Sequence, residues 1–181
     1  MRVLMVIIFI ILHLAGCGKH GLKLPPNADP IEKSSLLILL PKAEHAWWNK
    51  KGRIEDLSLI GWYVNDADLI HVVKLTDLCE LGLMGTSITD DGLMELKNNQ
   101  KLRALSLQYS QQFTDSGLKV LKCLPNITTL DLVHTNITDK SVEVLIQTNN
   151  LSHLFLKGTK ITQEGITQLK AKLPKTHIQT E

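Results

Sequence analysis

Residues 78–96 read LCELGLMGTSITDDGLMEL, and the spacing of their apolar residues changes halfway along. Leu81 and Leu83 alternate with other residues, which is the period of a strand buried on one face. Leu93 and Leu96 lie three residues apart, which is the spacing of a short amphipathic helix. A Thr-Asp pair stands between the two parts, where its side-chain oxygens can cap the helix. The stretch therefore predicts a strand, a turn and a helix.

The same pattern occurs five times. The units begin at Ile54, Leu78, Leu102, Ile127 and Leu151, so they are spaced 24, 24, 25 and 24 residues apart. Every unit has leucine three and five residues after its first residue, and the extra residue of the third unit lies between Ser110 and Phe113. A unit this small cannot bury its own leucine row and must stack on a neighbour. Five units exceed the three that a stable stack needs.

The consensus LxxLxLxxTxITDxGLxxL resembles the leucine-rich repeat, in the variety with a helix on the convex face that is seen in bacterial envelope proteins. The resemblance extends from Ile54 to about Pro174. It implies an α/β solenoid of right-handed β-α units, with a parallel sheet on the concave face and short helices on the convex face. Residues 54–181 then form five repeats and a terminal stub of a sixth strand near residues 176–179.

Four positions depart from the consensus. They are Trp62 in place of threonine, Ala67 and Ser141 in place of glycine, and Gln163 in place of aspartate. We interpret them as irregularities of individual units that leave the fold unchanged.

Residues 31–53 are predicted to form a helical N-terminal cap, because repeat stacks need sealed ends. Pro41 suits a first helical position. Leu40, Trp47 and Trp48 can cover the open leucine row of the first unit. At the other end the sequence predicts a weakly protected edge.

Residues 1–16 have the features of a signal peptide, with one basic residue, an apolar run and small residues before Cys17. The apolar run is shorter than the roughly 20 residues that cross a membrane. The stretch Leu14-Ala15-Gly16-Cys17 resembles the lipobox of bacterial lipoproteins, which implies cleavage before Cys17 and acyl chains, such as palmitate, attached at that residue. The alternative is an ordinary signal peptide whose cleavage site precedes a cysteine. Residues 17–30 lack periodicity and contain a proline pair, so they are predicted to form a flexible tether.

The lipid would anchor the protein in the cell membrane or the outer membrane, facing the periplasm or the exterior.

The composition excludes other classes of protein. With 20 Lys and Arg against 18 Asp and Glu, the net charge of +2 gives no basis for nucleic-acid binding, and 21% charged residues exclude a disordered polyelectrolyte. The three cysteines show no zinc-binding spacing, and we expect no metal or cofactor. Cys79 and Cys123 are expected to stay unpaired, because strands two ladders apart are about 10 Å from each other.

Alternate residues of each predicted strand should point to the concave face. The candidate partner-binding residues are Ile60, Glu80, Met84, Gln108, Tyr109, Asp131, Val133, His134, His153, Phe155 and Lys157. Four of them, Ile60, Met84, Val133 and Phe155, are expected to be exposed apolar groups. We predict a monomer that binds a protein or an extended peptide on this strip. A purely structural envelope protein with an idle concave face is the alternative.

Ser106, Asp131 and His153 fall on three consecutive predicted strands, so a hydrolase or an accessory domain of an envelope enzyme is a further alternative. The order argues against it, because a triad needs the histidine between the nucleophile and the acid. No glycine-rich elbow supplies an oxyanion hole either. Asp131, His134 and His153 could coordinate a metal, but such surface groups are more often unliganded. The sequence therefore predicts a protein that is not an enzyme.

Overall fold

The computed structural model describes residues 23, 24 and 26–181, so the predicted signal peptide, Cys17 and most of the predicted tether lie outside the described residues. Seven strands form one sheet in the order in which they occur in the sequence. The strands are β1 (Ala43–Trp48), β2 (Ile54–Ile60), β3 (Glu80–Met84), β4 (Ala104–Ser106), β5 (Thr129–Asp131), β6 (His153–Phe155) and β7 (His177–Gln179). Strands β2 to β7 run parallel, and β1 is antiparallel to β2.

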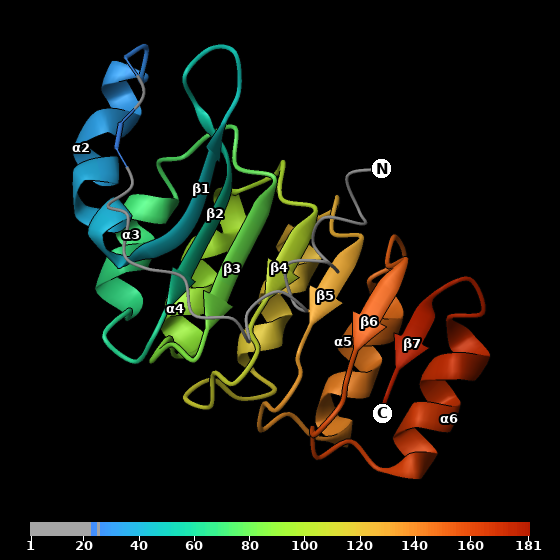
Figure 1. The fold of residues 1–181 in the computed structure, drawn as a ribbon. Coiled ribbons are helices and arrows are strands. Elements are labelled where there is room, and N and C mark those ends of the chain that lie inside the picture. Colours follow the sequence, from blue (N-terminus) through green and yellow to red (C-terminus); the bar gives the residue numbers. More distant parts are fainter. Residues whose placement is uncertain (1–22, 25) are drawn as a thin grey trace.

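Helices form the second layer and lie together on one side of the sheet (Figure 1). They are α2 (Pro30–Leu39), α3 (Asp66–Val72), α4 (Asp90–Glu95), α5 (Val142–Gln147) and α6 (Gln163–Lys172), with 3-10 segments η1 (Leu40–Lys42), η2 (Leu96–Asn98), η3 (Gly117–Cys123) and η4 (Asp139–Ser141). Each unit thus crosses from a strand to a helical segment and returns to the next parallel strand. None of the helices within the described residues is both long enough and apolar enough to span a membrane.

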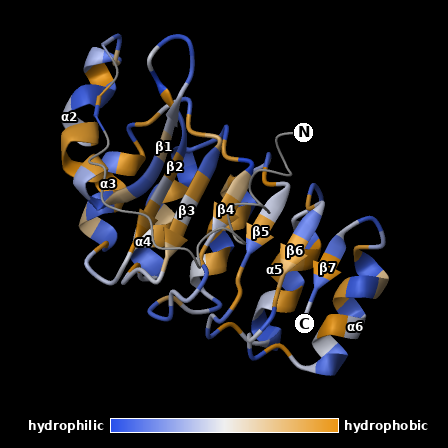
Figure 2. Ribbon diagram, viewed as in Figure 1, coloured by the Kyte–Doolittle hydropathy of each residue, from blue (hydrophilic) through white to orange (hydrophobic). Residues whose placement is uncertain are grey.

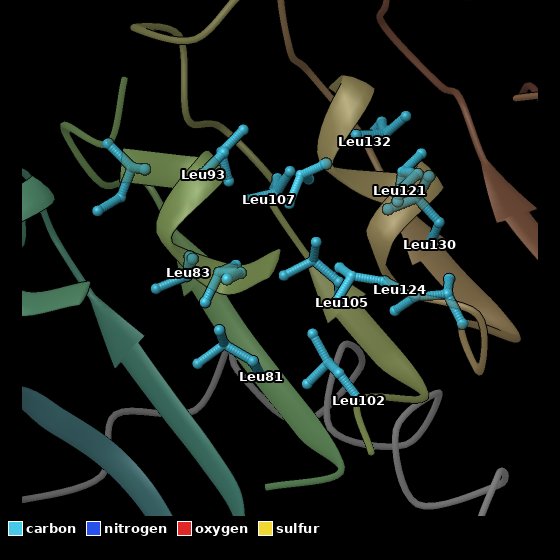
Figure 3. Close-up of a cluster of buried hydrophobic side chains, with 14 of the residues drawn as sticks. Leu81, Leu83, Leu93, Leu102, Leu105, Leu107, Leu121, Leu124, Leu130 and Leu132 are labelled. Atoms are coloured by element: carbon cyan, nitrogen blue, oxygen red, sulfur yellow. The ribbon is translucent and has the colours of Figure 1, made fainter. Parts of the chain in front are cut away.

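The core lies between the two layers. The strand leucines Leu57, Leu81, Leu105, Leu130 and Leu154 pair in register across the sheet and are buried. Helix leucines such as Leu93 and Leu121 meet the strand leucines from the other layer (Figure 3). Hydrophilic residues gather in the connecting loops, most visibly between β1 and β2 (Figure 2). Stacking therefore buries the leucine rows, as the repeat predicts.

The aspartates of the Thr-Asp pairs, together with Asp66 of the Asn65-Asp66 pair in the first unit, join consecutive units. In each step one carboxylate accepts two hydrogen bonds from the threonine of the next unit, one from its backbone N–H and one from its hydroxyl, at 2.6 to 2.9 Å. The four steps, which we call the Asp–Thr ladder, are Asp66 to Thr89, Asp90 to Thr114, Asp115 to Thr138 and Asp139 to Thr162. The sequence predicts helix capping for both residues of the pair. That role is correct for Thr138 and Thr162, whereas the aspartates bind the following unit.

The glycine of the consensus leaves room for the aspartate of the preceding unit. A Cβ atom at Gly117 would lie 2.6 Å from the Asp90 carboxylate, and Gly92 and Gly165 face equivalent overlaps. Ser141 occupies the same position and donates a hydrogen bond from its hydroxyl to Asp115. In the first unit this position is occupied by Asp68, so the alignment of Ala67 with the glycines is wrong by one residue. Asp68 accepts a hydrogen bond from the backbone N–H of Asn65 and forms an ion pair with Lys42 of the cap. Gln163 begins the last helix, directly after the fourth step of the ladder.

The cap differs in part from the prediction. Its helical part is α2 and η1, which contains Pro41, and Leu36, Leu39 and Leu40 are buried. Residues 43–48, however, form a strand and not a helix, because an antiparallel strand can satisfy the open backbone edge of β2. Trp48 packs against the core, but Trp47 is 60% exposed and does not cover the leucine row.

Glu32 fixes the cap to the repeats. Its side chain is 1% exposed, and its two carboxylate oxygens accept from the backbone N–H groups of Ile54 and Thr76 at 3.1 and 3.2 Å. Burial raises the pKa of Glu32, and the two hydrogen bonds only partly oppose this. Lys42 adds an ion pair with Asp68 at 2.6 Å. The first unit is therefore closed by hydrogen bonds and an ion pair as well as by apolar contact.

Candidate functional site

The register of the sheet brings the predicted concave residues into rows. One row runs through Asp56, Glu80, Ala104, Thr129, His153 and His177, and the next runs through Ser58, Gly82, Ser106, Asp131, Phe155 and Gln179. Ile60 pairs with Met84 in a third row. We call these rows, with Gln108, Tyr109, Val133, His134 and Lys157 that follow the strands, the concave strip. Their residues differ from unit to unit, whereas the leucines on the opposite face are the same in units one to five.

The concave strip is not uniformly exposed. Ile60, Glu80, Met84, Val133 and His153 are half-buried, while Lys157 is exposed. Phe155 is only 8% exposed, so the prediction of an exposed apolar group is wrong at this position. Its neighbours in register are Asp131 and Gln179, and the ring of His153 stacks near it with centroids 6.5 Å apart. Phe155 therefore contributes to packing between strands more than to a free surface.

The side chains of Asp131 and Gln108 form a hydrogen bond with each other inside the concave strip. Asp131 is 3% exposed, and its carboxylate accepts from the Gln108 side-chain amide and from the backbone N–H of Val133 at 3.0 Å. Burial raises the pKa of Asp131, although these two hydrogen bonds act in the opposite direction. The pair is a buried polar contact between the third and fourth units. It leaves little of either side chain for a partner to contact.

The geometry of Ser106, Asp131 and His153 does not form a catalytic triad. Ser106 lies opposite Asp131, but the Asp131 carboxylate is occupied by Gln108 and Val133. His153 lies in the row of Thr129 and stacks with Phe155. Within residues 23, 24 and 26–181, no cluster of three His, Cys, Asp or Glu side chains is arranged to hold a metal ion.

Cys79 and Cys123 are free thiols and half-buried. Burial raises the pKa of Cys79, and its thiol donates a hydrogen bond to the carbonyl oxygen of Asp77 at 3.3 Å. A thiol with a raised pKa is mostly protonated near neutral pH and is a poor nucleophile. Cys79 therefore does not have the environment of a catalytic cysteine.

Tyr109 and His134 have an unusual backbone conformation. Their φ angles are +58° and +54°, in the left-handed region that side chains other than glycine rarely adopt. The equivalent residues of the other units are Gly61, Gly85 and Gly158, which also have positive φ. At four of these positions the backbone N–H donates a hydrogen bond to a carbonyl oxygen of the next unit. The donor and acceptor residues are Gly61 and Met84, Gly85 and Gln108, Tyr109 and Val133, and His134 and Lys157. The turn thus requires a left-handed residue in every unit, and two units place a ring there.

The two rings stack on each other, with centroids 4.8 Å apart and planes inclined by 22°. The His134 ring occupies the space that a side chain at Gly158 would need. The place of Tyr109 and His134 after the strands predicts them as site residues, but it predicts neither the stacking of their rings nor the left-handed turn. The glycines 24 and 48 residues before Tyr109 were the available signal.

The start of the strip carries an ion pair. His45 on β1 lies 3.2 Å from the Asp56 carboxylate on β2. The hydrogen bond that His45 donates to the Asp56 carboxylate raises the pKa of His45 more than burial lowers it. This end of the strip therefore combines acidic groups with a histidine that holds its proton more readily than usual.

Part of the chain is similar in sequence to a known repeat family. The sequence model described as Leucine Rich repeat matches residues 98–122 and 123–145, which include most of the third and fourth units. The fold is a leucine-rich repeat (LRR) solenoid. This confirms the predicted fold class. A search of curated protein sequences finds no significant match.

Two solved LRR structures share the fold over most of this chain. An LRR protein of Leptospira interrogans is 21% identical with a TM-score of 0.53, and the match covers 83% of this chain and 34% of that one. The LRR ectodomain of a receptor kinase from Arabidopsis thaliana is 11% identical with a TM-score of 0.50, and the match covers 86% of this chain and 94% of that one. The chain thus spans about a third of the length of the Leptospira protein.

Proposed function

We propose that the protein is a non-enzymatic interaction module that binds a protein or an extended peptide on its concave strip. LRR proteins typically mediate protein–protein interaction. The observation that carries the proposal is the contrast between the two faces of each strand. The buried face repeats leucine in units one to five, whereas the concave face changes from unit to unit and includes charged, apolar and aromatic groups.

The size of the strip fits an extended segment. Six parallel strands spaced about 4.8 Å apart span about 24 Å, which is the length of roughly seven extended residues. Ile60 and Met84 provide apolar contact at one end, and Lys157 provides a charge at the other. Exposed aromatic groups such as Tyr109 frequently dominate interface energy.

The hydrolase alternative lacks support because the Asp131 carboxylate binds Gln108 and Val133. The test of the proposed function is capture from intact cells by chemical crosslinking, with the wild type compared with Met84→Glu and Lys119→Glu. Met84 lies on the concave strip, and Lys119 is an exposed residue of η3 on the convex face. We expect Met84→Glu to lose the partner and Lys119→Glu to keep it. Capture of nothing by any variant would favour a purely structural protein.

The proposal includes lipid attachment at Cys17 and location at the cell membrane or outer membrane, facing the periplasm or the exterior. Its support is the sequence Leu14-Ala15-Gly16-Cys17 and the 12 residues between Cys17 and the start of α2 at Pro30. Such a segment reaches at most about 45 Å, which allows a monomer to present its concave strip away from the bilayer. Several acyl chains on one cysteine give stable anchoring, whereas one alone is marginal.

Membrane fractionation tests the anchor. The variant Cys17→Ser is expected to move from the detergent-soluble membrane fraction to the soluble fraction, because it removes the lipid and leaves the repeats unchanged. Cys79→Ser is the matched control and should stay with the membrane. Membrane association of Cys17→Ser would contradict the lipoprotein proposal.

A further inference from the structure

Exposed aromatic residues gather where the strands of the first units end. We call residues 61–63, 85–87, 109–112 and 134–136 the turn edge; these segments follow β2, β3, β4 and β5. The turn edge contains both tyrosines of the chain, one of its three tryptophans and His134. Trp62 is 78% exposed, and Tyr63 and Tyr109 are about half exposed. This density of uncovered rings is a feature of a binding surface.

The rings are arranged around an opening. The Tyr63 ring lies against Gly61, 2.8 Å from where a Cβ atom would stand, and the Tyr109 ring stacks on His134. Between these two units lies Gly85, whose Cβ position has no neighbouring atom within 4 Å. The second unit therefore leaves open space at Gly85, between the first unit, where the Tyr63 ring covers Gly61, and the third unit, where Tyr109 is the equivalent residue.

Tyr109 and His134 carry their rings at positions where the backbone is in the left-handed region. A left-handed conformation is unfavourable for a residue with a side chain, and three of the five units avoid it with glycine. Tyr109 and His134 keep their rings in spite of it. Strained positions of this kind cluster at ligand-contacting sites.

The turn edge carries no Asp, Glu, Lys or Arg, although 21% of the residues in the chain are charged. Its other side chains are small hydroxyl groups and amides, such as Ser87, Gln111 and Asn136. Flat rings and neutral hydrogen-bonding groups fit an uncharged partner that offers flat apolar rings and backbone carbonyl oxygens. A proline-rich segment has both.

The spacing of the rings matches such a segment. The units of Tyr63 and Tyr109 are two strands apart, which is about 9.6 Å at 4.8 Å per strand. A polyproline II helix has three residues per turn and advances about 9.3 Å per turn. We propose that the turn edge binds a proline-rich segment of a partner protein in the polyproline II conformation. Prolines three residues apart then reach the first unit, where the Tyr63 ring covers Gly61, and the third unit, where Tyr109 occupies the equivalent turn position. The open space at Gly85 receives the residues between them.

This inference rests on the proposed interaction function and names the class of partner. The test measures fluorescence anisotropy of a labelled peptide of four Ala-Pro-Pro repeats with the full chain in detergent. A peptide of four Ala-Gly-Gly repeats is the control. Binding of the proline peptide alone is expected, and equal binding of the two peptides, or binding of neither, would overturn the proposal.

The chain itself provides the variants. Tyr109→Gly installs the residue that three other units have, so we expect a thermal midpoint equal to or above that of the wild type but at least tenfold weaker peptide binding. Gly85→Tyr fills the gap with a ring at a position that tolerates one in the next unit, and should weaken binding similarly. Trp47→Ala removes an exposed ring from β1, away from the turn edge, and should leave binding unchanged.

Two further results would contradict the turn-edge proposal, and a third would separate its failure from a failure of the proposed function. Unchanged peptide binding by Tyr109→Gly and Gly85→Tyr would place the peptide elsewhere and contradict the proposal. Binding of chitotetraose that depends on Tyr109, with no binding of the peptide, would assign the turn edge to sugars and also contradict it. A cellular partner that is lost only with Met84→Glu would support the concave strip while the turn-edge proposal fails.

Discussion

The Asp–Thr ladder and the concave strip each take residues from consecutive units, but they use them in opposite ways. In the ladder the same two side chains make the same two hydrogen bonds at four successive steps. In the concave strip each unit presents different side chains, some of them buried and some exposed. The difference teaches that positions identical between units stabilise stacking, whereas the positions that change fall into two groups, buried residues that pack between strands and exposed residues with no role in stacking.

The largest effect on stability is expected in the core beneath both regions. Leu130 is fully buried on β5, and Leu130→Ala removes its contacts and leaves a cavity, which costs about 2–5 kcal/mol. Lys119→Ala on the convex face is the matched control and should change stability by less than about 0.5 kcal/mol. Chemical denaturation measures both. A small loss for Leu130→Ala would mean that the strands do not stack through this leucine row.

The ladder should contribute the next largest effect. Asp115 accepts from the backbone N–H and hydroxyl of Thr138 and from the hydroxyl of Ser141. Asp115→Ala leaves these donors without the carboxylate and should cost about 1–3 kcal/mol in the free energy of unfolding. Gln163→Ala is the control, because Gln163 takes the place of aspartate at the end of the ladder and is exposed. Equal effects of the two variants would contradict the role of the ladder.

Stability should depend on pH in opposite directions through Asp115 of the ladder and through Asp131 of the concave strip. We expect this effect to be smaller than the effects of Leu130→Ala and Asp115→Ala. Burial raises the pKa of Asp115, but hydrogen bonds from Ser141 and Thr138 outweigh it and hold the pKa below its ordinary value of 3.8. This contribution is fully present above pH 3.8 and is lost as the pH falls through the folded-state pKa. Asp131 has a pKa raised by burial, so protonation of this carboxyl favours the folded state.

Thermal midpoints of two variants measure this difference. The stability advantage of the wild type over Asp115→Asn should be constant between pH 7 and pH 5 and should narrow below pH 3.8. Relative to Asp131→Asn, the wild type should instead gain stability as the pH falls through the raised pKa of Asp131. The same pH trend in both comparisons would show that the two carboxyl groups have similar environments.

Much of the fold could be predicted because leucine spacing depends on burial, which a repeated pattern reports directly. The partner of each aspartate could not, because Asp90 and Thr114 are 24 residues apart and the helix start beside Asp90 offered a local alternative. Residues 43–48 form a strand because of the open edge of β2, a tertiary effect that their own sequence does not contain. The alternation of the strand predicts that Phe155 faces away from the leucine row, but its burial depends on side chains from the strands beside it.

Site-specific photocrosslinking tests the central claim, that the concave strip binds a partner, most directly. A photoreactive residue placed at position 84 on β3 or at position 133 after β5 should crosslink to one protein or peptide in intact cells. The same residue at position 119 on η3 or position 143 on α5 should give no such product. Crosslinking to a common partner from positions 119 and 143, with none from positions 84 and 133, would contradict the account.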